Sequence, residues 1–490
     1  MTDDTAYSLI DGAVFEGSGD PVVVDDPATG AERLRYRDGG QDAAAAALDS
    51  AQQGGRAWRA LSPSRRGEVL VEASQRIRAA AEDLALLECA SAGKPIRDTR
   101  AEAQKVAEMF AFYAGFADKL LGDVVPVPTS HLNIVTREPF DTVVQLTPWN
   151  APLFTAGWQL APALAAGCAA VLKPSELTPS SSLALARILH EAGVPAGAVN
   201  VVAGLGGTAG ARLVSDERAG RVVFIGSVPT GRRVAAAAAG AGRPALLELG
   251  GKSANIVFAD ADLKRAARAA QGAIFAAAGQ SCTAGSRLLV QRPVYDQMVE
   301  WVSKAAARLV VGRPSDPATE VGPINNRRQF ERVCGLIETG VNEGARLMTG
   351  GPAADLAPGF FVRPTVFADV TRDMTIASEE IFGPVLAISP FDDEEEALAL
   401  ANGGVFDLAG AVWTRDVYRA IRMAKSIRAG TVWVNGYRSL SVMSPFGGMR
   451  GSGFGRSSGI DVMHEYTQAK SLWIETDETA VAPFGYGPED

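Results

Sequence analysis

Short apolar segments alternate with helical ones from Thr142 to Leu249, and this alternation limits the possible folds more than any other feature of the chain. Five segments are apolar at nearly every position, as strands covered on both faces are: Val143 to Leu146, Ala169 to Leu172, Val199 to Val202, Val222 to Ile225 and Ala245 to Leu249. Helical stretches separate them: Leu153 to Ala166, Ser180 to Ala192, Ala209 to Val214 and Gly231 to Ala239. The pattern predicts a parallel sheet of the nucleotide-binding type, with ligand sites at the carboxyl ends of its strands.

The stretch from Thr142 to Leu172 carries no charged residue and is long enough to cross a bilayer, which takes about 20 residues. Three prolines and three amide side chains interrupt it: Pro148, Pro152, Pro162, Gln145, Asn150 and Gln159. Because each amide would need a polar partner in lipid, we interpret the stretch as a buried strand, a turn and a buried helix near an active site.

The N-terminal part of the chain is predicted to be mainly helical after short strands that end near Gly40. Apolar residues at spacings of three and four predict helices over Leu70 to Ala92 and Arg100 to Leu121, after an alanine-rich helix from Asp42 to Trp58. His131 to Pro139 is expected to be extended.

A second α/β block is expected to begin near Gly251. Its predicted helices and strands are Asp262 to Ala276, Leu288 to Gln291, Ala409 to Trp413, Val417 to Ile427 and Thr431 to Asn435, and a last strand covers Ser471 to Glu475. With about 150 residues per domain as a guide, the 490 residues predict roughly three domains.

Charge and composition exclude several classes of protein. The 47 basic and 56 acidic residues give a net charge of −9 with no basic block, which argues against a nucleic-acid-binding protein. His131, His190 and His464 are too scattered for a metal site, and no G-x-S-x-G motif supports a serine hydrolase. The four cysteines include no C-x-x-C pair, and Met1 to Thr5 does not resemble a signal peptide, so we expect a cytoplasmic protein without metal or disulfides.

Cys282 is the cysteine most suited to reaction, because it lies in a loop from Gly279 to Arg287 that is rich in small residues. A free cysteine is more often a small buried hydrophobe, and we interpret Cys89, Cys168 and Cys334 in this way. On the loop pattern alone, both interpretations of Cys282 stay open.

Two polar residues directly follow or end predicted strands. Glu248 is either a buried carboxylate with a raised pKa or a solvated charge at a strand end. Asn150 lies between prolines after a strand, where its amide could donate to a developing oxyanion.

Six motifs are spread over nearly the whole chain: Pro148-Trp-Asn150, Leu172-Lys-Pro-Ser-Glu176, Leu247-Glu-Leu-Gly-Gly-Lys252, Gly279-Gln-Ser-Cys282, Glu380-Ile-Phe-Gly-Pro384 and Pro445-Phe-Gly-Gly448. In this order, and with the separation of 282 − 248 = 34 between Glu and Cys, the chain resembles the NAD(P)-dependent aldehyde dehydrogenase superfamily from about Leu9 to Trp473.

The resemblance implies oxidation of an aldehyde to a carboxylic acid. Cys282 would be the nucleophile and Glu248 the base that activates water to hydrolyse a thioester. Asn150 and the Cys282 backbone N–H would hold the oxyanion, and Lys173 is included in the catalytic set. A CoA-acylating enzyme and a non-catalytic relative are the alternatives. The first generally lacks a glutamate at the Glu248 position, and the second would be expected to lose Cys282, Asn150 or Glu248.

The resemblance also implies the cofactor contacts. Lys173 and Glu176 fall at the adenosine ribose, where a carboxylate favours NAD and leaves NADP as the alternative, and Ser175 between them is a further implied cofactor contact. The other implied contacts are Trp149, Gly226, Ser227 and Leu249, and of these Trp149 and Ser227 fall at the pyrophosphate. Glu380 and Phe382 fall at the nicotinamide, and Gln329 is a weaker candidate there. The glycines from Gly204 to Gly210 are not interpreted as the phosphate loop.

The implied substrate tunnel is lined by Phe154, Thr155, Trp158, Ser281, Thr283, Leu440 and Phe446. Arg438 falls near its mouth, either as a cation for a carboxylate or phenolate tail or as a solvated surface arginine. We expect a medium-sized aldehyde with an aromatic or polar tail.

Four residues depart from the family pattern. Ile225 and Val228 replace common threonines, and Arg450 replaces a frequent lysine. Ser457 stands where many members carry a glutamate that is proposed to relay protons.

The implied fold is α/β, with a Rossmann-type cofactor domain (1–122 and 142–250), an α/β catalytic domain (251–450) and a small β oligomerisation element (123–141 and 465–490). A partner subunit would cover the arm from Val125 to Pro139 and the strand from Leu472 to Thr476, which predicts a homodimer or homotetramer. The expected partner is a small aldehyde, with no nucleic acid and no membrane.

Overall fold

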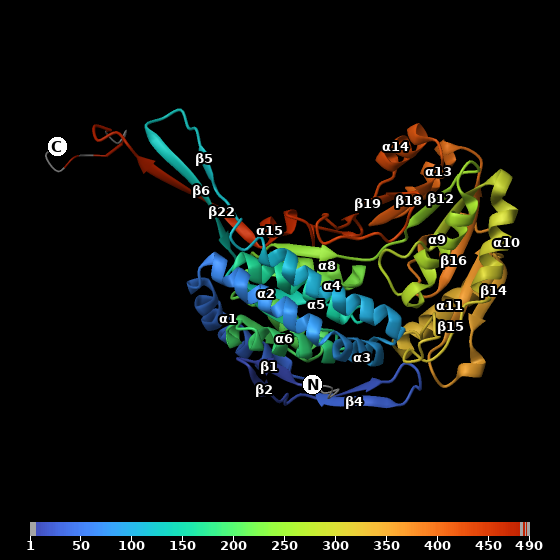
Figure 1. Ribbon diagram of the computed structural model, residues 1–490, viewed down its shortest axis with the longest axis horizontal. Coiled ribbons are helices and arrows are strands. Elements are labelled where there is room, and N and C mark those ends of the chain that lie inside the picture. Colours follow the sequence, from blue (N-terminus) through green and yellow to red (C-terminus); the bar gives the residue numbers. More distant parts are fainter. Residues whose placement is uncertain (1–5, 481–483, 486, 488–490) are drawn as a thin grey trace.

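The computed structural model describes residues 6–480, 484, 485 and 487. Two α/β bodies lie side by side, and a narrow arm of strands projects from the first of them (Figure 1). The first five residues and part of the predicted oligomerisation element (481–483, 486 and 488–490) lie outside the described residues.

The first body is built on an eight-stranded sheet in the order β2-β1-β9-β8-β7-β10-β11-β21. Its strands are β1 (Ser8–Ile10), β2 (Ala13–Phe15), β7 (Thr142–Leu146), β8 (Ala169–Lys173), β9 (Val199–Val201), β10 (Arg221–Ile225), β11 (Ala245–Glu248) and β21 (Gly453–Phe454). The five strands from β9 to β11 are parallel. Because the chain runs outward from β7 to β9 and then returns to β10 on the other side of β7, the switch point of the sheet lies between β7 and β10.

Helices cover both faces of this sheet. They are α1 (Gly40–Ala60), α2 (Pro63–Ala79), α3 (Ala81–Ala92), α4 (Ile96–Ala114), α5 (Pro152–Ala166), α6 (Ser180–Glu191), α7 (Ala211–Ser215) and α8 (Val228–Gly240). Neighbouring residues of β7 enter different cores, since Val143 packs with residues of α2 to α6 and Val144 with residues of α1, α7 and α8. Burial on both faces explains why these strands are apolar at nearly every position.

The second body contains a seven-stranded sheet in the order β14-β15-β16-β13-β12-β18-β19, parallel except for β14. Its strands are β12 (Ala254–Val257), β13 (Arg287–Gln291), β14 (Arg346–Pro352), β15 (Val362–Ala368), β16 (Val385–Phe391), β18 (Ala409–Trp413) and β19 (Thr431–Val434). Its helices are α9 (Leu263–Phe275), α10 (Tyr295–Ala306), α11 (Arg327–Asn342), α12 (Thr375–Ser378), α13 (Glu394–Ala401) and α14 (Val417–Ser426).

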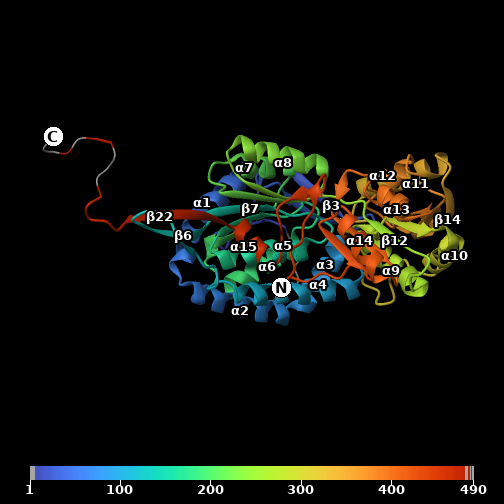
Figure 2. The ribbon, with the colours of Figure 1, turned by 90° about the horizontal axis from the view of Figure 1, so that it is seen from above.

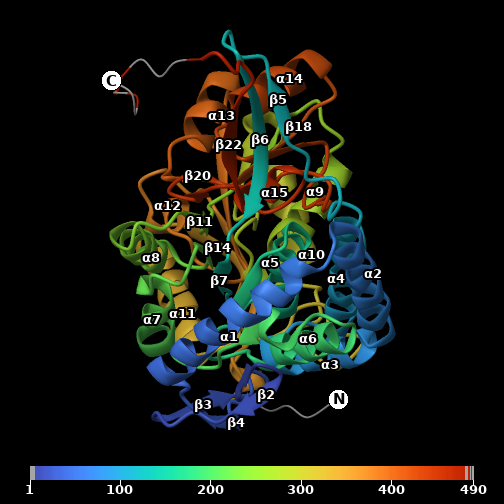
Figure 3. The same ribbon diagram turned by 90° about the vertical axis from the view of Figure 1, so that its left-hand side faces the viewer.

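The arm is a three-stranded antiparallel sheet in the order β22-β6-β5. It joins β5 (Asp123–Val125) and β6 (His131–Pro139) to β22 (Thr467–Glu475), which follows the short helix α15 (Asp461–Glu465). Seen from above, the arm extends away from the second body (Figure 2). The arm and the hairpin of β3 (Pro21–Asp25) and β4 (Glu32–Arg37) lie at opposite ends of the first body (Figure 3). Two further short strands, β17 (Phe406–Asp407) and β20 (Met449–Arg450), pair with each other.

The predicted strand, turn and helix in the charge-free stretch are confirmed by β7 and α5, and 13 of the 15 residues of α5 are buried. Two helix predictions are wrong in extent. Leu70 to Ala92 is not one helix, because Ala80 leaves the helical conformation (φ −90°, ψ 8°) between α2 and α3. The helix predicted to reach Leu121 ends at Ala114, and the chain forms turns from Gly115 to Asp118.

Among the described residues, no helix has the length and apolar character needed to span a bilayer. No group of three or more His, Cys, Asp or Glu side chains in the same residues is arranged to hold a metal ion.

Candidate active site

The Cys282 loop is held in an unusual backbone conformation. After α9, Ala277, Ala278 and Gly279 all have positive φ (52°, 52° and 71°), which redirects the chain sharply. A Cβ atom on Gly279 would lie 2.0 Å from the carbonyl oxygen of Gly383, so only glycine allows this loop to pack on the loop before β16. Cys89 and Cys168 are buried, whereas Cys282 stays partly exposed, and so does Cys334, for which the interpretation as a buried residue is wrong.

Two glycines bring the end of β11 against the same loops. Glu248 is the last residue of β11, and Gly250 and Gly251 follow it. A Cβ on Gly251 would lie 2.2 Å from the Cys282 carbonyl oxygen, and one on Gly250 would lie 2.2 Å from Glu380 Oε2. The glycines of the Glu-Leu-Gly-Gly-Lys motif therefore allow Glu248, Cys282 and Glu380 to share one site.

The Glu248 carboxyl group is 4% exposed, and burial raises its pKa to about 8. Ser457 Oγ donates to its Oε1 at 2.7 Å, which lowers the pKa and so opposes the effect of burial. Oε2 has no hydrogen-bond partner among the described residues. Of the two interpretations of Glu248, the buried carboxylate is confirmed, and one of its oxygens is free to accept a proton.

The Cys282 thiol is protonated at neutral pH in this arrangement. Burial raises its pKa to about 12, and the charges of Glu248 and Glu380 act in the same direction, while Arg438 opposes them. A base beside a thiol with this pKa increases the fraction that is present as the nucleophilic thiolate. Glu248, with a pKa close to neutrality, is suited to that task.

Asn150 lies at the Cys282 loop as predicted from the sequence. Its Nδ2 donates to the carbonyl oxygen of Gln280, two residues before Cys282, at 2.8 Å. Gln280 is in turn fixed because its Oε1 accepts from the Asn325 backbone at 2.9 Å. An amide nitrogen carries two hydrogens, so one N–H of Asn150 stays available for an oxygen bound next to the thiol.

The first body provides a site that fits a dinucleotide at its switch point. Lys173 is buried at the end of β8, where its Nζ donates to the Pro174 carbonyl at 2.9 Å and lies 3.7 Å from Glu176 Oε2. The Glu176 carboxylate suits a ribose diol better than a phosphate, and the Lys173 ammonium offsets part of its repulsion of a phosphate. Ser175 is buried beside them, and its Oγ accepts from the Leu177 backbone.

The turn after β10 leads into the N-terminus of α8. Ser227 is the N-cap residue, but its side chain makes no cap bond and its Oγ donates to Thr230 Oγ1 at 3.1 Å. Gly226 donates to the Glu248 carbonyl at 3.0 Å, and the Leu249 side chain fills the space beside Gly231. Exposed Ser227 and the uncapped helix start suit an anionic group such as a pyrophosphate.

The nicotinamide candidates come together across the two bodies. Phe382 contacts Trp149, which is a candidate for the pyrophosphate, edge to face with ring centroids 5.3 Å apart. Glu380 Oε1 accepts from the Gly251 backbone at 2.9 Å, and burial raises the Glu380 pKa to about 7. Gln329 Nε2 donates to the carbonyls of Ile381 and Phe382, at 2.9 and 3.1 Å, so it positions this loop rather than facing a ligand.

The tunnel candidates form one aromatic cluster and one hydroxyl pair. Phe154 and Trp158 of α5 have ring centroids 5.2 Å apart, and Trp158 and Phe446 are 5.1 Å apart. Ser281 and Thr283, on either side of Cys282, share a hydrogen bond of 3.1 Å. Thr155 Oγ1 donates to the carbonyl oxygen of Ala151, the residue directly before α5. Leu440 is 43% exposed.

Sequence reasoning missed two residues that support the site. Glu88 is fully buried in α3, and its carboxylate accepts from the Leu153 backbone at the start of α5 and from Ser181 Oγ. It thereby caps the helix that carries Phe154 and Trp158. Tyr437 OH donates to the Thr283 carbonyl at 3.1 Å. A glutamate inside the apolar stretch Leu84 to Cys89 could have indicated a buried carboxyl group, whereas no sequence pattern indicated a role for Tyr437.

Comparisons with known proteins agree with this geometry. The model of the aldehyde dehydrogenase family matches residues 15–472. A betaine aldehyde dehydrogenase of Cereibacter sphaeroides is 44% identical over 99% of this chain and 98% of its own length. Human retinal dehydrogenase 2 is 40% identical over 94% of this chain and 89% of its own. The crystal structure of Staphylococcus aureus betaine aldehyde dehydrogenase with NAD+ superposes with a TM-score of 0.95 at 32% identity, covering 98% of this chain and 96% of that one.

Proposed function

Because the chain belongs to the aldehyde dehydrogenase family, we propose that Cys282, Glu248 and Asn150 carry out the oxidation of an aldehyde to a carboxylic acid. The protein is an NAD-dependent aldehyde dehydrogenase with the α/β fold of that family. The arrangement that best supports these roles is the partly exposed Cys282 beside the buried, singly bonded Glu248 carboxyl group.

In the first half of the reaction, the Glu248 carboxylate takes the Cys282 proton and releases it to solvent, and the thiolate sulfur forms a bond to the carbonyl carbon. The carbonyl oxygen becomes an oxyanion, which accepts hydrogen bonds from the free N–H of Asn150 and from the Cys282 backbone. NAD, when bound, takes the hydrogen and electron pair of the aldehyde C–H bond. Cys282 then carries the acyl group as a thioester.

In the second half, Glu248 takes a proton from a water molecule, and the resulting hydroxide attacks the thioester carbon. The carbon–sulfur bond breaks, the carboxylic acid leaves, and the Cys282 thiolate regains its proton from Glu248. The free Oε2 of Glu248 accepts the proton, while Ser457 holds Oε1. The adenosine ribose would be held by Lys173, Ser175 and Glu176. The region of the pyrophosphate would be held by Trp149, Gly226, Ser227 and Leu249, and the nicotinamide end would be held by Glu380 and Phe382.

The test is an assay of purified protein with NAD and a panel of aldehydes, with and without CoA. We expect NADH and a free carboxylic acid without CoA. NADH that forms only with CoA would replace hydrolysis by acyl transfer, and no NADH with any aldehyde would overturn the proposed function.

Replacing Ser457 with alanine should move the pH profile of hydrolysis to higher pH. Glu248 acts as a base only when deprotonated, so the wild-type rate should rise through the Glu248 pKa of about 8. The Ser457 bond stabilises the carboxylate, and its loss should raise that pKa by about one unit. The measurement is kcat against pH. Ser458→Ala removes a neighbouring hydroxyl that bonds to the Ser444 carbonyl and should leave the profile in place. An unshifted profile in S457A would contradict the role of the bond.

We also propose that the arm joins subunits into a homo-oligomer, as a dimer or tetramer, and that the enzyme acts in the cytoplasm. The four free cysteines support a reducing compartment. The outer strands of the arm have unpaired edges, and several large apolar side chains are exposed there: Val124, Leu132, Leu472, Trp473 and Ile474. Edges of this kind are usually covered by a partner.

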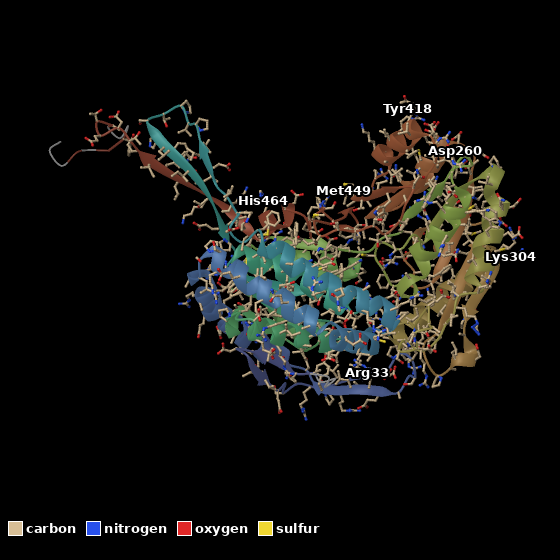
Figure 4. The ribbon with its side chains drawn as sticks, viewed as in Figure 1. Arg33, Asp260, Lys304, Tyr418, Met449 and His464 are labelled. Carbon is tan, nitrogen blue, oxygen red and sulfur yellow. The ribbon has the colours of Figure 1, made fainter. Side chains whose placement is uncertain are left out.

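Replacing Trp473, which is 57% exposed, with aspartate should therefore reduce the mass measured by light scattering after size exclusion. Tyr418→Asp is the matched control, since Tyr418 is 74% exposed but lies on the second body, away from the arm (Figure 4). A wild-type protein that is already monomeric would contradict the proposed assembly.

We propose the cofactor domain, catalytic domain and oligomerisation element with the boundaries predicted from the sequence.

A further inference from the structure

The loop that carries Arg438 is folded over the Cys282 loop. Tyr437 OH donates to the Thr283 carbonyl, and a Cβ on Gly285 would lie 2.9 Å from the Tyr437 ring. Trp433 packs on the Tyr437 ring with centroids 4.7 Å apart and donates to the Ser439 carbonyl at 2.9 Å. These contacts on both sides of Arg438 fix its position beside the residues that follow the nucleophile.

Arg438 has a left-handed backbone (φ 62°), which is costly for a residue with a Cβ. Asn435 is also left-handed (φ 51°), and its side chain is bonded to both backbone groups of Thr414. The anchoring of this turn therefore does not depend on the Arg438 side chain. Strain of this kind is typically retained at functional sites.

The Arg438 guanidinium has no ion-pair partner within 4.0 Å among the described residues. Its one hydrogen bond there is a long one, from Nη1 to the Gly272 carbonyl at 3.4 Å. The nearby acid Asp98 pairs with Arg97 instead, at 3.4 Å. Arg438 is thus a half-buried cation with unused donors, unlike the half-buried Arg419, which bonds to the carboxylates of Asp260 and Glu394.

The positive charge of Arg438 acts electrostatically on the Cys282 thiol. It lowers the pKa of the Cys282 thiol, against the larger effect of burial, and it also lowers the pKa of Tyr437. The chain from Arg438 to Phe446 passes from half-exposed Leu440 to buried Phe446, which packs in the aromatic cluster with Trp158. Arg438 therefore lies at the solvent end of a segment whose other end enters the apolar wall of the proposed tunnel.

We propose that the substrate is an aldehyde with a carboxylate at the end remote from its carbonyl, and that Arg438 binds this carboxylate. The inference rests on the proposed function of Cys282 and adds the chemical class of the substrate. A guanidinium with several free N–H donors suits a carboxylate, while the aromatic rings suit the apolar part of the molecule. The same cation repels the trimethylammonium group of betaine aldehyde, so the name of the 44% identical relative does not give the substrate of this chain.

The test compares aldehydes that differ only in tail charge. The wild-type enzyme is assayed with NAD and with ω-oxo carboxylates of four to six carbons, with the corresponding ω-oxo amides, and with betaine aldehyde. For the chain length that fits best, we expect kcat/KM for the acid to exceed that for the amide by about 10- to 100-fold, mainly through KM. Betaine aldehyde should be the poorest substrate. Added NaCl should reduce the acid-to-amide ratio, because salt screens partly exposed charges.

Replacing Arg438 with glutamine should bring the acid-to-amide ratio close to one, and Arg438→Lys should retain part of it. The ratio is measured on a single preparation, so a loss of folded enzyme does not change it. Arg56→Gln is the matched control, since Arg56 is an exposed arginine on α1 and should leave the ratio as in the wild type.

Three outcomes would overturn the inference. They are a wild-type ratio near one at every chain length, a ratio that R438Q does not lower, and betaine aldehyde as the best substrate. In each of these cases NADH still forms, so the proposed function stands. If no aldehyde of any charge gives NADH, the proposed function itself has failed.

Discussion

Replacing Cys282 with alanine should abolish aldehyde oxidation, with a fall in kcat of about four orders of magnitude or more. Only Cys282 combines partial exposure with a position beside Glu248 and Asn150, because the glycines at 250, 251 and 279 bring three loops together there. Without the sulfur no covalent intermediate forms, and the bound aldehyde has no nucleophile. The measurement is NADH formation under saturating NAD and aldehyde.

Cys334→Ala is the control for this substitution, because Cys334 is also a partly exposed free cysteine but lies in α11. It should keep the wild-type rate. NAD binding by C282A, followed through the quenching of tryptophan fluorescence, should persist and would show that the variant is folded. Residual oxidation by C282A within tenfold of the wild type would contradict the assignment of the nucleophile.

Replacing Glu248 with glutamine should separate the two halves of the reaction. Glutamine cannot take a proton from water, so steady-state turnover should fall by about 10²- to 10⁴-fold. Addition of the thiol should be slowed less, because the small thiolate fraction is withdrawn by its reaction with the aldehyde. Rapid mixing should therefore show a burst of NADH of about one equivalent per site, followed by a very slow phase.

Glu379→Gln is the matched control. Glu379 is exposed on the loop that also carries Glu380, and its Oε2 lies 3.5 Å from Nη2 of Arg332. It should show normal steady-state turnover. A steady-state rate in E248Q equal to that of the wild type would exclude Glu248 as the base. A loss of the burst together with turnover would place the main role of Glu248 in the first half of the reaction.

The fold could be predicted well from the sequence wherever one physical constraint dominates. Strands buried on both faces are mostly apolar, so β7 to β11 were visible as short, mainly apolar runs between helices. The break at Ala80 was not visible, because α2 and α3 both bury apolar residues at helical spacing and no Gly or Pro lies between them. Periodicity identifies a buried face, and it does not locate a change of helix axis.

The site was predictable in its residue types but not in its contacts. Cys282 and Glu248 stayed ambiguous one by one, and only the six motifs taken together distinguished them from buried structural residues. The bond from Ser457 to Glu248 joins residues 209 positions apart, through β21 pairing with β11. The lack of an ion-pair partner for Arg438 among the described residues likewise depends on how the loop after β19 packs near the first turn of α4. Such contacts follow from tertiary packing, which no local pattern in the sequence encodes.

The covalent state of Cys282 during turnover tests the account most directly. Glu248→Gln enzyme is mixed with NAD and an oxidisable aldehyde, quenched in acid, and analysed by intact-mass and peptide mass spectrometry. We predict one acyl group per chain in place of a thiol hydrogen, on the peptide that contains Cys282, and none when NAD is omitted. A Cys282 peptide that is unmodified both in this variant and in wild-type enzyme quenched during turnover, or an acyl group on Cys334, would contradict the proposed mechanism.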